Sequence, residues 1–232
     1  MSEQAAKELV DKGVTQSEAN KAQEALPLYD EVIQKFGGSS EIGVRIQVAR
    51  AFINKGIALH QLQKPNEALA LYDEAIQRFD KGDEKLREVV AKALLQKANV
   101  LRELNRVEES VAVCDDVLKR ADAKTLPVPV AGALFTKAHA LGSLGRHDEA
   151  LKLYDELVSS FGGAGDAALR PLIAGGLFSK SVLLRLKNQP EAAVATYDEL
   201  IKRFGEAPEP HLRGMAAMAQ QSRSELQSIP KK

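Results

Sequence analysis

The sequence predicts an all-α protein in which antiparallel helix pairs stack side by side into a solenoid. Five similar segments recur along the 232 residues, at intervals of 43, 42, 40 and 43 residues. A period in this range is typical of stacked supersecondary units. Apolar residues within the segments follow the three-four spacing of one buried helical face, and no alternating run is long enough to predict a strand.

The downstream half of each repeat, which we call helix B, is centred on a tyrosine in four of the five copies. These segments cover 24–37, 67–80, 109–122, 149–162 and 192–205, with central residues Tyr29, Tyr72, Cys114, Tyr154 and Tyr197. Pro65 and Pro190 lie where the first turn of helix B is expected, because a proline there removes no hydrogen bond that the helix needs. We expect the glycines that follow helix B to adopt left-handed caps. These glycines are Gly37, Gly162 and Gly205.

The upstream half of each repeat, helix A, covers 9–21, 52–64, 94–106, 134–146 and 177–189. Connections of about three residues force helices A and B to run antiparallel. One pair cannot bury its own apolar face, so successive pairs are expected to share a core.

We expect a single domain over residues 1–232. Its repeats are expected over about 2–38, 39–81, 82–123, 124–164 and 165–206. A further helix, over about 208–228, carries Leu212, Met215, Ala219 and Leu226 on one face and polar residues on the other, as a capping helix requires. In the third repeat Cys114 replaces the tyrosine, and Pro127 stands where an arginine is expected. These departures predict a change in stacking between the third and fourth repeats, and neutral drift is the alternative.

The small and aromatic positions resemble those of the tetratricopeptide repeat (TPR) family. They are Gly56, Leu59, Ala68, Tyr72 and Ala75 in the second repeat, and Ala138, Leu141, Gly145, Ala150 and Tyr154 in the fourth. The resemblance covers about residues 4–205 and implies a right-handed α-solenoid of five TPR-like helix-turn-helix repeats plus a C-terminal capping helix. The family's usual unit has about 34 residues, so this chain resembles a long variant of about 42 residues, with extra turns at the start of helix A. A HEAT-type array has a similar period, but the tyrosine spacing argues against it.

Lysine and aspartate recur in a fixed register. A lysine precedes each central residue at a constant spacing, and an aspartate directly follows each one. The lysines are Lys12, Lys55, Lys97, Lys137 and Lys180; the aspartates are Asp30, Asp73, Asp115, Asp155 and Asp198; the arginines that follow the aspartates at a nearly constant spacing are Arg45, Arg87, Arg170 and Arg213. We predict a structural ladder in which lysine and aspartate pair within a repeat, and the arginine reaches the same aspartate from the next repeat. The alternative is that the lysines line a groove for an anionic ligand.

Composition and charge exclude several function classes. The 32 basic residues balance the 32 acidic residues, so the chain has no net field to attract nucleic acid or anionic lipid. The single cysteine allows no internal disulfide, and the sequence shows neither a signal peptide nor a membrane helix. We therefore expect a cytoplasmic protein without nucleic-acid or membrane partners.

No pattern of residues predicts catalysis, a cofactor or a metal. The sequence has no dinucleotide-binding or Walker phosphate loop, and the glycine-rich segment 162–165 ends a helix, so we expect a cap there. The histidines, His60, His139, His147 and His211, have no partner at metal-ligand spacing. Cys114 replaces a core tyrosine, so we expect it to be buried and inert. An enzyme would instead require a deep polar cavity with converging ionisable groups.

The resemblance implies a partner-binding surface on the concave face that helix A builds. The residues carried onto this face are Arg50, Asn54, Lys92, Gln96, Asn99, Arg102, Phe135, His139, Phe178 and Arg185. The face is polar and basic early and aromatic later, which suits a peptide with an acidic part and an apolar part. The alternative is that both phenylalanines belong to the core. Some family members clamp a C-terminal carboxylate; Asn54 and Lys92 match part of that clamp, but Val10, Val14 and Gln96 depart from it.

The sequence therefore predicts a non-enzymatic scaffold that binds a protein or peptide segment. The alternative is a structural module that forms a homo-oligomer through the repeat ends, or is the repeat portion of a larger assembly.

Overall fold

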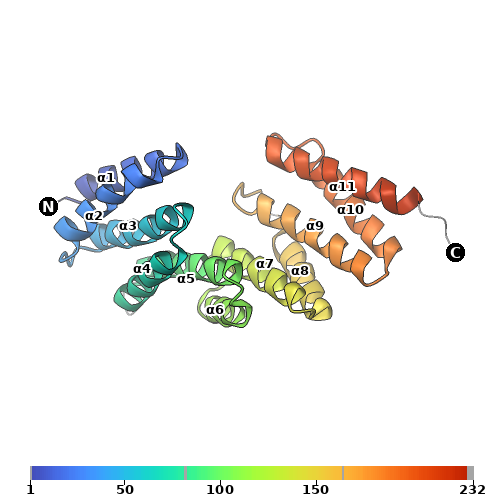
Figure 1. The fold of residues 1–232 in the computed structure, drawn as a ribbon, viewed down its shortest axis with the longest axis horizontal. Helices are drawn as coiled ribbons and strands as arrows, with labels where there is room; N and C mark the ends of the chain where they lie inside the picture. Colours follow the sequence, from blue (N-terminus) through green and yellow to red (C-terminus); the bar gives the residue numbers. More distant parts are fainter. Residues whose placement is uncertain (1, 81–82, 164, 229–232) are drawn as a thin grey trace. The chain divides into compact units, whose positions relative to one another are not determined.

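The computed structural model describes residues 2–80, 83–163 and 165–228, and these residues form helices joined by turns, with no strand (Figure 1). The prediction of an all-α fold is confirmed. The helices are α1 (Glu3–Glu18), α2 (Ala22–Phe36), α3 (Ile42–Gln61), α4 (Pro65–Phe79), α5 (Glu84–Glu103), α6 (Val107–Arg120), α7 (Pro127–Ser143), α8 (His147–Phe161), α9 (Arg170–Leu186), α10 (Pro190–Phe204) and α11 (Pro210–Ser228).

The chain forms two compact units, residues 1–121 with α1–α6 and residues 122–232 with α7–α11. In the first unit α1, α3 and α5 are the A helices; each packs on the B helix that follows it, and α3 also packs on both α1 and α5. In the second unit α7, α9 and α11 are the A helices; α7 packs on α8, α9 packs on α7, α10 and α11, and α11 packs on α9 and α10. We call these two sets the A layers. The expected boundary between the second and third repeats, at 81 and 82, lies outside the described residues.

In the second and third repeats the extra length lies mainly in helix A. Helices α3 and α5 have 20 residues each, whereas α2 and α4 have 15. A long A helix offers additional turns of side chains to its neighbours in the layer, which enlarges the shared core between successive pairs.

The central tyrosines fill the space between the two helices of a pair. Tyr29 and Tyr72 are at most 1% exposed. A Cβ at Gly13 would lie 2.5 Å from the Tyr29 ring, and a Cβ at Gly56 would lie 2.5 Å from the Tyr72 ring. Helix A can therefore approach the ring closely only because these two positions lack a side chain. Cys114 takes the tyrosine position in the third repeat and is buried, as expected.

The turn from helix A to helix B has one conformation throughout. Its second residue has a positive φ in every pair, at Asn20, Gln63, Asn105, Gly145 and Asn188. In the second pair the Gln63 N–H donates to the His60 carbonyl at 3.0 Å, and the Lys64 N–H donates to the Leu59 carbonyl at 2.9 Å. These two bonds form a Schellman motif, which satisfies carbonyls at the end of helix A.

The predicted left-handed caps after helix B are wrong. Gly37, Gly162 and Gly205 have φ values of −59°, −61° and −57°, so the chain stays right-handed there. Gly162 instead permits a close approach, because a Cβ on it would lie 2.6 Å from Nη1 of Arg203. The glycine-rich segment around it is thus a helix end, although Ala164 lies outside the described residues.

Prolines begin four of the described helices, α4, α7, α10 and α11. Pro65 and Pro190 are the first residues of α4 and α10, as predicted, and Pro127 begins α7 in the same way. The division between the two units falls just before this last helix, at the junction where the sequence departs from its pattern. The change in stacking expected at that junction stays a prediction.

Candidate functional site

The recurring lysines and aspartates form ion pairs between successive repeats. The Lys55 Nζ lies 2.6 Å from Oδ1 of Asp30, which belongs to the preceding B helix. The Lys97–Asp73 pair of the first unit and the Lys180–Asp155 pair of the second unit have the same geometry, at 2.5 Å each. Arg223 of α11 takes the lysine position and lies 2.6 Å from Asp198.

The predicted pairing within a repeat is therefore wrong. Gly56 faces Tyr72 of its own repeat. Neighbouring residues on a helix are turned by about 100° from each other. Lys55 is thereby directed away from its own B helix and towards the preceding one. Its side chain is 22% exposed and that of Asp30 is 42% exposed, so the cation is partly buried and the carboxylate remains in contact with water.

Two arginines of the predicted ladder have other partners. Arg170 donates from Nη2 to Oε2 of Glu209 at 3.1 Å, and its guanidinium lies 5.5 Å from the centre of the Phe204 ring. Arg213 donates from Nη1 to the Ala207 carbonyl at 2.6 Å. The prediction that these two arginines reach an aspartate is wrong. The remaining ladder residues are Lys12 on α1, Arg45 on α3, Arg87 on α5, Asp115 on α6 and Lys137 on α7.

The A layer of the first unit is charged, and its charges bind one another. Arg50 donates from Nη1 to Gln47 at 2.8 Å and from Nη2 to Asp11 at 3.1 Å. Asp11 also accepts from Lys7 at 2.5 Å. The hydrogen bond from Lys7, and then that from Arg50, lowers the pKa of the Asp11 carboxyl below its usual value. The network holds Arg50 at the boundary between α1 and α3.

Other charged side chains of this layer are also paired. Lys92 lies 2.7 Å from Glu88, one turn away on α5. Glu103 lies 2.8 Å from Nε2 of His60 on α3, and Arg102 lies 3.8 Å from the same carboxylate. The remaining expected residues, Asn54, Gln96 and Asn99, are partly buried on α3 and α5.

The A layer of the second unit is apolar by comparison. Phe135 and Phe178 are partly exposed, and each packs on the central tyrosine of its own repeat. The ring centres of Phe135 and Tyr154 are 6.2 Å apart, and those of Phe178 and Tyr197 are 6.0 Å apart. The two phenylalanines thus lie between the core and the surface. His139 and Arg185 are exposed on α7 and α9.

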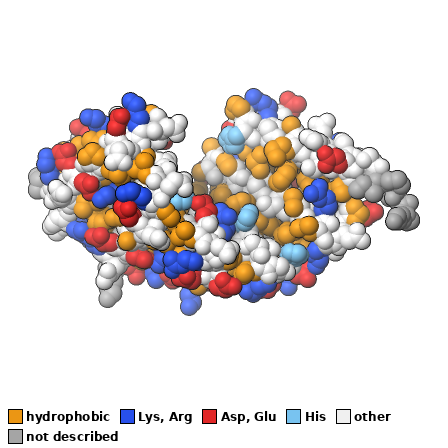
Figure 2. Space-filling model, in the orientation of Figure 1, with side chains coloured by type: hydrophobic (Ala, Val, Ile, Leu, Met, Phe, Trp, Pro, Cys, Tyr) orange, Lys and Arg blue, Asp and Glu red, His pale blue; other side chains and the backbone are white. Residues whose placement is uncertain are grey.

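Two residues of this layer were not found from the sequence. Leu186 of α9 is 65% exposed and Met218 of α11 is 57% exposed, and they are the most exposed large apolar side chains of the described chain. Figure 2 shows hydrophobic side chains gathering over α9 and between α9 and α11. A signal existed for Leu186, because it occupies the position that Gln61 and Glu103 occupy in the first unit.

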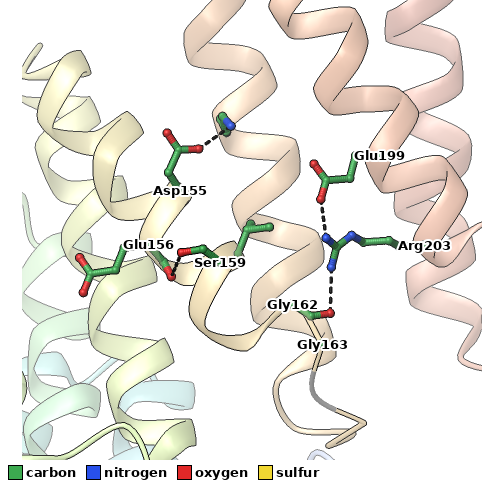
Figure 3. Close-up of a pocket in the computed structure, with 9 residues that line it drawn as sticks. Asp155, Glu156, Ser159, Gly162, Gly163, Glu199 and Arg203 are labelled. Carbon is green, nitrogen blue, oxygen red and sulfur yellow. Dashed lines mark hydrogen bonds and ion pairs between the residues drawn. The ribbon is translucent and has the colours of Figure 1, made fainter.

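An open pocket of about 790 Å³ lies on the other side of the second unit, between α8, α9 and α10 (Figure 3). Lys180 and Asp155 pair inside it, and Arg203 donates to Glu199 at 2.5 Å and to the Gly162 carbonyl at 2.8 Å. These side chains hold one another and do not converge on a common point. The same residue types recur in the first unit, where Arg78 donates to the Gly37 carbonyl. We interpret the pocket as the junction between two repeats.

No group of three or more His, Cys, Asp and Glu side chains could hold a metal ion within the described part of the chain. Among the described helices, none is both long enough and apolar enough to span a membrane.

Comparison with solved structures shows a similar fold at low sequence identity. MamA from Desulfovibrio magneticus RS-1, residues 41 to the end, has a TM-score of 0.62 at 14% identity, over 88% of this chain and 97% of that chain. A Podosopora anserina protein described as a kinesin light chain with nearly identical TPR-like repeats has a TM-score of 0.67 at 15% identity, over 95% and 99%. YrrB, described as a TPR protein with an unusual peptide-binding site, has a TM-score of 0.55 at 16% identity, over 92% and 90%. No curated protein matches the sequence.

The family model of the tetratricopeptide repeat matches this sequence over residues 10–84, 54–124 and 135–209. These segments include the central residue of every B helix, Cys114 among them. Repeats of this family typically serve protein–protein interaction and not catalysis. The buried tyrosines, the close A–B packing and the match over most of the chain agree, and the protein belongs to the tetratricopeptide repeat family.

Proposed function

We propose that this protein is a non-enzymatic interaction scaffold that binds a segment of a partner protein on its A layers. The observation that carries the proposal is the exposure of large apolar side chains, Leu186 and Met218, on the A layer of the second unit. Where exposed apolar side chains form a contiguous patch, that patch is typical of a surface that another molecule covers. A peptide-binding site in the structurally similar YrrB supports the same assignment.

The first unit contributes polar specificity in this proposal. Arg50, Lys92 and Arg102 are positioned by the ion pairs described above. Because each cation is already shared with a carboxylate, a partner gains less from it than from a free cation, and the polar contacts fix register more than affinity. The paired Lys92 makes the carboxylate clamp of some relatives a poor description of this face.

Selection of peptides tests the proposal directly. A library of short random peptides displayed on phage would be selected against the full chain, and binding of the selected peptides would be measured by fluorescence anisotropy. We expect the peptides to bind the wild type, and to lose affinity in at least one A-layer variant, either R50E/K92E/R102E or L186E/M218E. A matched control, K35E/K119E/K202E, reverses three charges on B helices and should bind as the wild type does.

The proposal fails if the selected peptides bind both A-layer variants as tightly as the wild type. Circular dichroism of each variant establishes that it is folded before the comparison is made.

Self-association through the repeat ends has no comparable support. On α1, Glu8 and Thr15 are exposed at the positions where Ala51 and Ala58 of α3 are buried. The face of α1 that another repeat would cover is therefore polar, and sedimentation of the protein over a range of concentrations would measure any association.

A further inference from the structure

The two units differ at equivalent positions of their A layers. Five residues before the recurring lysine, the first unit has Lys7, Arg50 and Lys92, whereas the second has Gly132, Gly175 and Met218. Six residues after that lysine, the first unit has Glu18, Gln61 and Glu103, whereas the second has Ser143 and Leu186. Charge at these positions is thus confined to the first unit, although the fold of the repeats is the same.

Apolar side chains of the second unit form a continuous stripe along α9. Phe178, Val182 and Leu186 are spaced four residues apart, so they lie on one side of the helix over about 12 Å. Phe178 and Val182 are partly exposed and Leu186 is mostly exposed.

Met218 of α11 extends this stripe sideways. In the first unit, the equivalent residue Arg50 reaches across to Asp11 of the preceding A helix. In the second unit, the equivalent position of α9, Gly175, faces Phe135, because a Cβ there would lie 3.0 Å from that ring. We expect the same relationship between α9 and α11, with Met218 beside Phe178 and Ser179. We call Phe178, Val182, Leu186 and Met218 the α9–α11 patch.

The charges that α7 and α9 bring to the patch are of one sign. Helix α9 carries Arg170, Lys180 and Arg185 and contains neither Asp nor Glu, and α7 contains no acidic residue. Arg170 and Lys180 are paired with carboxylates. Arg185 makes no ion pair with any residue that the structure describes and lies next to Leu186, at the edge of the patch. A partner on the patch therefore meets apolar area flanked by an available cation.

We infer that the α9–α11 patch binds an amphipathic helix of a partner protein whose apolar stripe is flanked by acidic residues. An amphipathic helix presents its apolar anchors at i, i+3, i+4 and i+7 along one side. That apolar side can pack along the stripe of α9, whose side chains are four residues apart. Aspartate or glutamate beside those anchors complements Arg185 and also favours the correct orientation of the helix. This inference rests on the proposed function and adds to it the unit that binds and the chemistry of the partner.

Three synthetic peptides of equal length test the inference with the full chain. The first has leucines at i, i+3, i+4 and i+7 spacing with glutamates beside them, the second has lysines in place of those glutamates, and the third has the composition of the first with its leucines scrambled. We expect the first to bind best in fluorescence anisotropy titrations. Leu186→Glu and Met218→Glu should each weaken it about tenfold or more, and Arg185→Glu should weaken the first peptide and strengthen the second.

Gln61→Glu is the matched control, because it places the same carboxylate at the equivalent position of the first unit and should leave binding of the first peptide unchanged. Equal binding of the acidic and basic peptides, or unchanged binding in Leu186→Glu, overturns the inference. If phage-selected peptides bind but lose affinity only in R50E/K92E/R102E, the proposed function stands and the patch is not its site.

Two further outcomes assign the patch to a different occupant and overturn the inference. One is binding of the wild type, but not of Leu186→Glu, to vesicles of phosphatidylcholine and phosphatidylserine. The other is a dimer, measured by sedimentation, that Leu186→Glu dissociates.

Discussion

The ammonium group of Lys55 lies 2.6 Å from Oδ1 of Asp30, and this ion pair joins helix A of one repeat to helix B of the repeat before it. The two residues are 25 positions apart in the chain. The contact therefore belongs to the interface between repeats and not to the helix pair itself. Water still reaches the carboxylate, which weakens the attraction between the two charges.

Replacement of Lys55 by methionine should lower the free energy of unfolding in urea by about 0.5–1 kcal/mol. The loss is small because the Asp30 carboxylate is in contact with water and remains solvated when its partner is removed. A double-mutant cycle with Asp30→Asn should give a coupling free energy in the same range. Lys12→Met is the control, since Lys12 is exposed on α1, and it should be neutral. Zero coupling between Lys55 and Asp30 would leave the ladder without a structural role.

Gln63 has a positive φ of 60°, so replacement by glycine should change stability in the opposite direction from the same replacement inside a helix. A residue with a Cβ in this conformation costs about 1–2 kcal/mol relative to the right-handed helix, whereas glycine adopts it freely. Gln63→Gly should therefore stabilise the protein by up to about 1 kcal/mol, and Gly145→Ala should destabilise it by a similar amount. Gln61→Gly, two residues earlier and inside α3, should destabilise. Thermal unfolding measures all three, and destabilisation by Gln63→Gly would contradict the assigned turn.

Arg78 should contribute to the junction between the first two repeats. Its guanidinium donates to the Gly37 carbonyl and lies 5.6 Å and 5.7 Å from the ring centres of Phe52 and Phe79. Arg78→Ala should cost about 1–2 kcal/mol, because it removes a charged hydrogen bond and a cation–π contact. Lys35 has the equivalent position in the first repeat but pairs only along its own helix with Glu31. Lys35→Ala should cost less than about 0.5 kcal/mol, and an equal loss in both variants would contradict the proposed role of Arg78.

Stability should fall in alkaline solution because burial raises the pKa of two tyrosine phenols. Burial raises the pKa of the Tyr72 phenol and, to a smaller extent, that of Tyr29. The unfolded phenols lose their protons near pH 10, while the folded phenols keep theirs to higher pH. The unfolded state thus binds fewer protons above pH 10, and the free energy of unfolding decreases there by up to about 1.4 kcal/mol per pH unit for each tyrosine.

Urea unfolding at successive pH values, with tyrosinate absorbance as a second signal, measures this dependence. Tyr72→Phe should reduce the slope above pH 10 and leave the slope between pH 7 and 9 unchanged. A free energy of unfolding that stays constant above pH 10 would contradict the burial argument.

The sequence predicted those features that depend on one helix or on a repeated spacing. Pro65 marked the first turn of α4, and Tyr72 marked the buried centre of its repeat, because both follow from local rules that hold in any helix of this length. The strict register of lysine and aspartate also indicated that the two residue types act together.

The sequence could not show which neighbour each side chain faces. Lys55 was assigned to Asp73 of its own repeat, but one residue of rotation on helix A decides between the two B helices beside it. The glycine at 162 was assigned to a left-handed cap, whereas its role is to admit the guanidinium of Arg203. The exposure of Leu186 depends on which helices surround the end of α9. The spacing of residues along one helix does not show which helices these are.

Each repeat contributes an aspartate that pairs with the lysine of the next repeat, and a lysine that pairs with the aspartate of the repeat before it. Each copy therefore carries both residue types of the ion pair between repeats. An internal duplication of one whole repeat would create a new junction with the same contacts as the old ones, and would leave the existing junctions intact. The array could therefore lengthen or shorten by whole units during evolution without a compensating substitution, whereas a change of half a repeat that placed two A helices in succession would leave a lysine without its carboxylate.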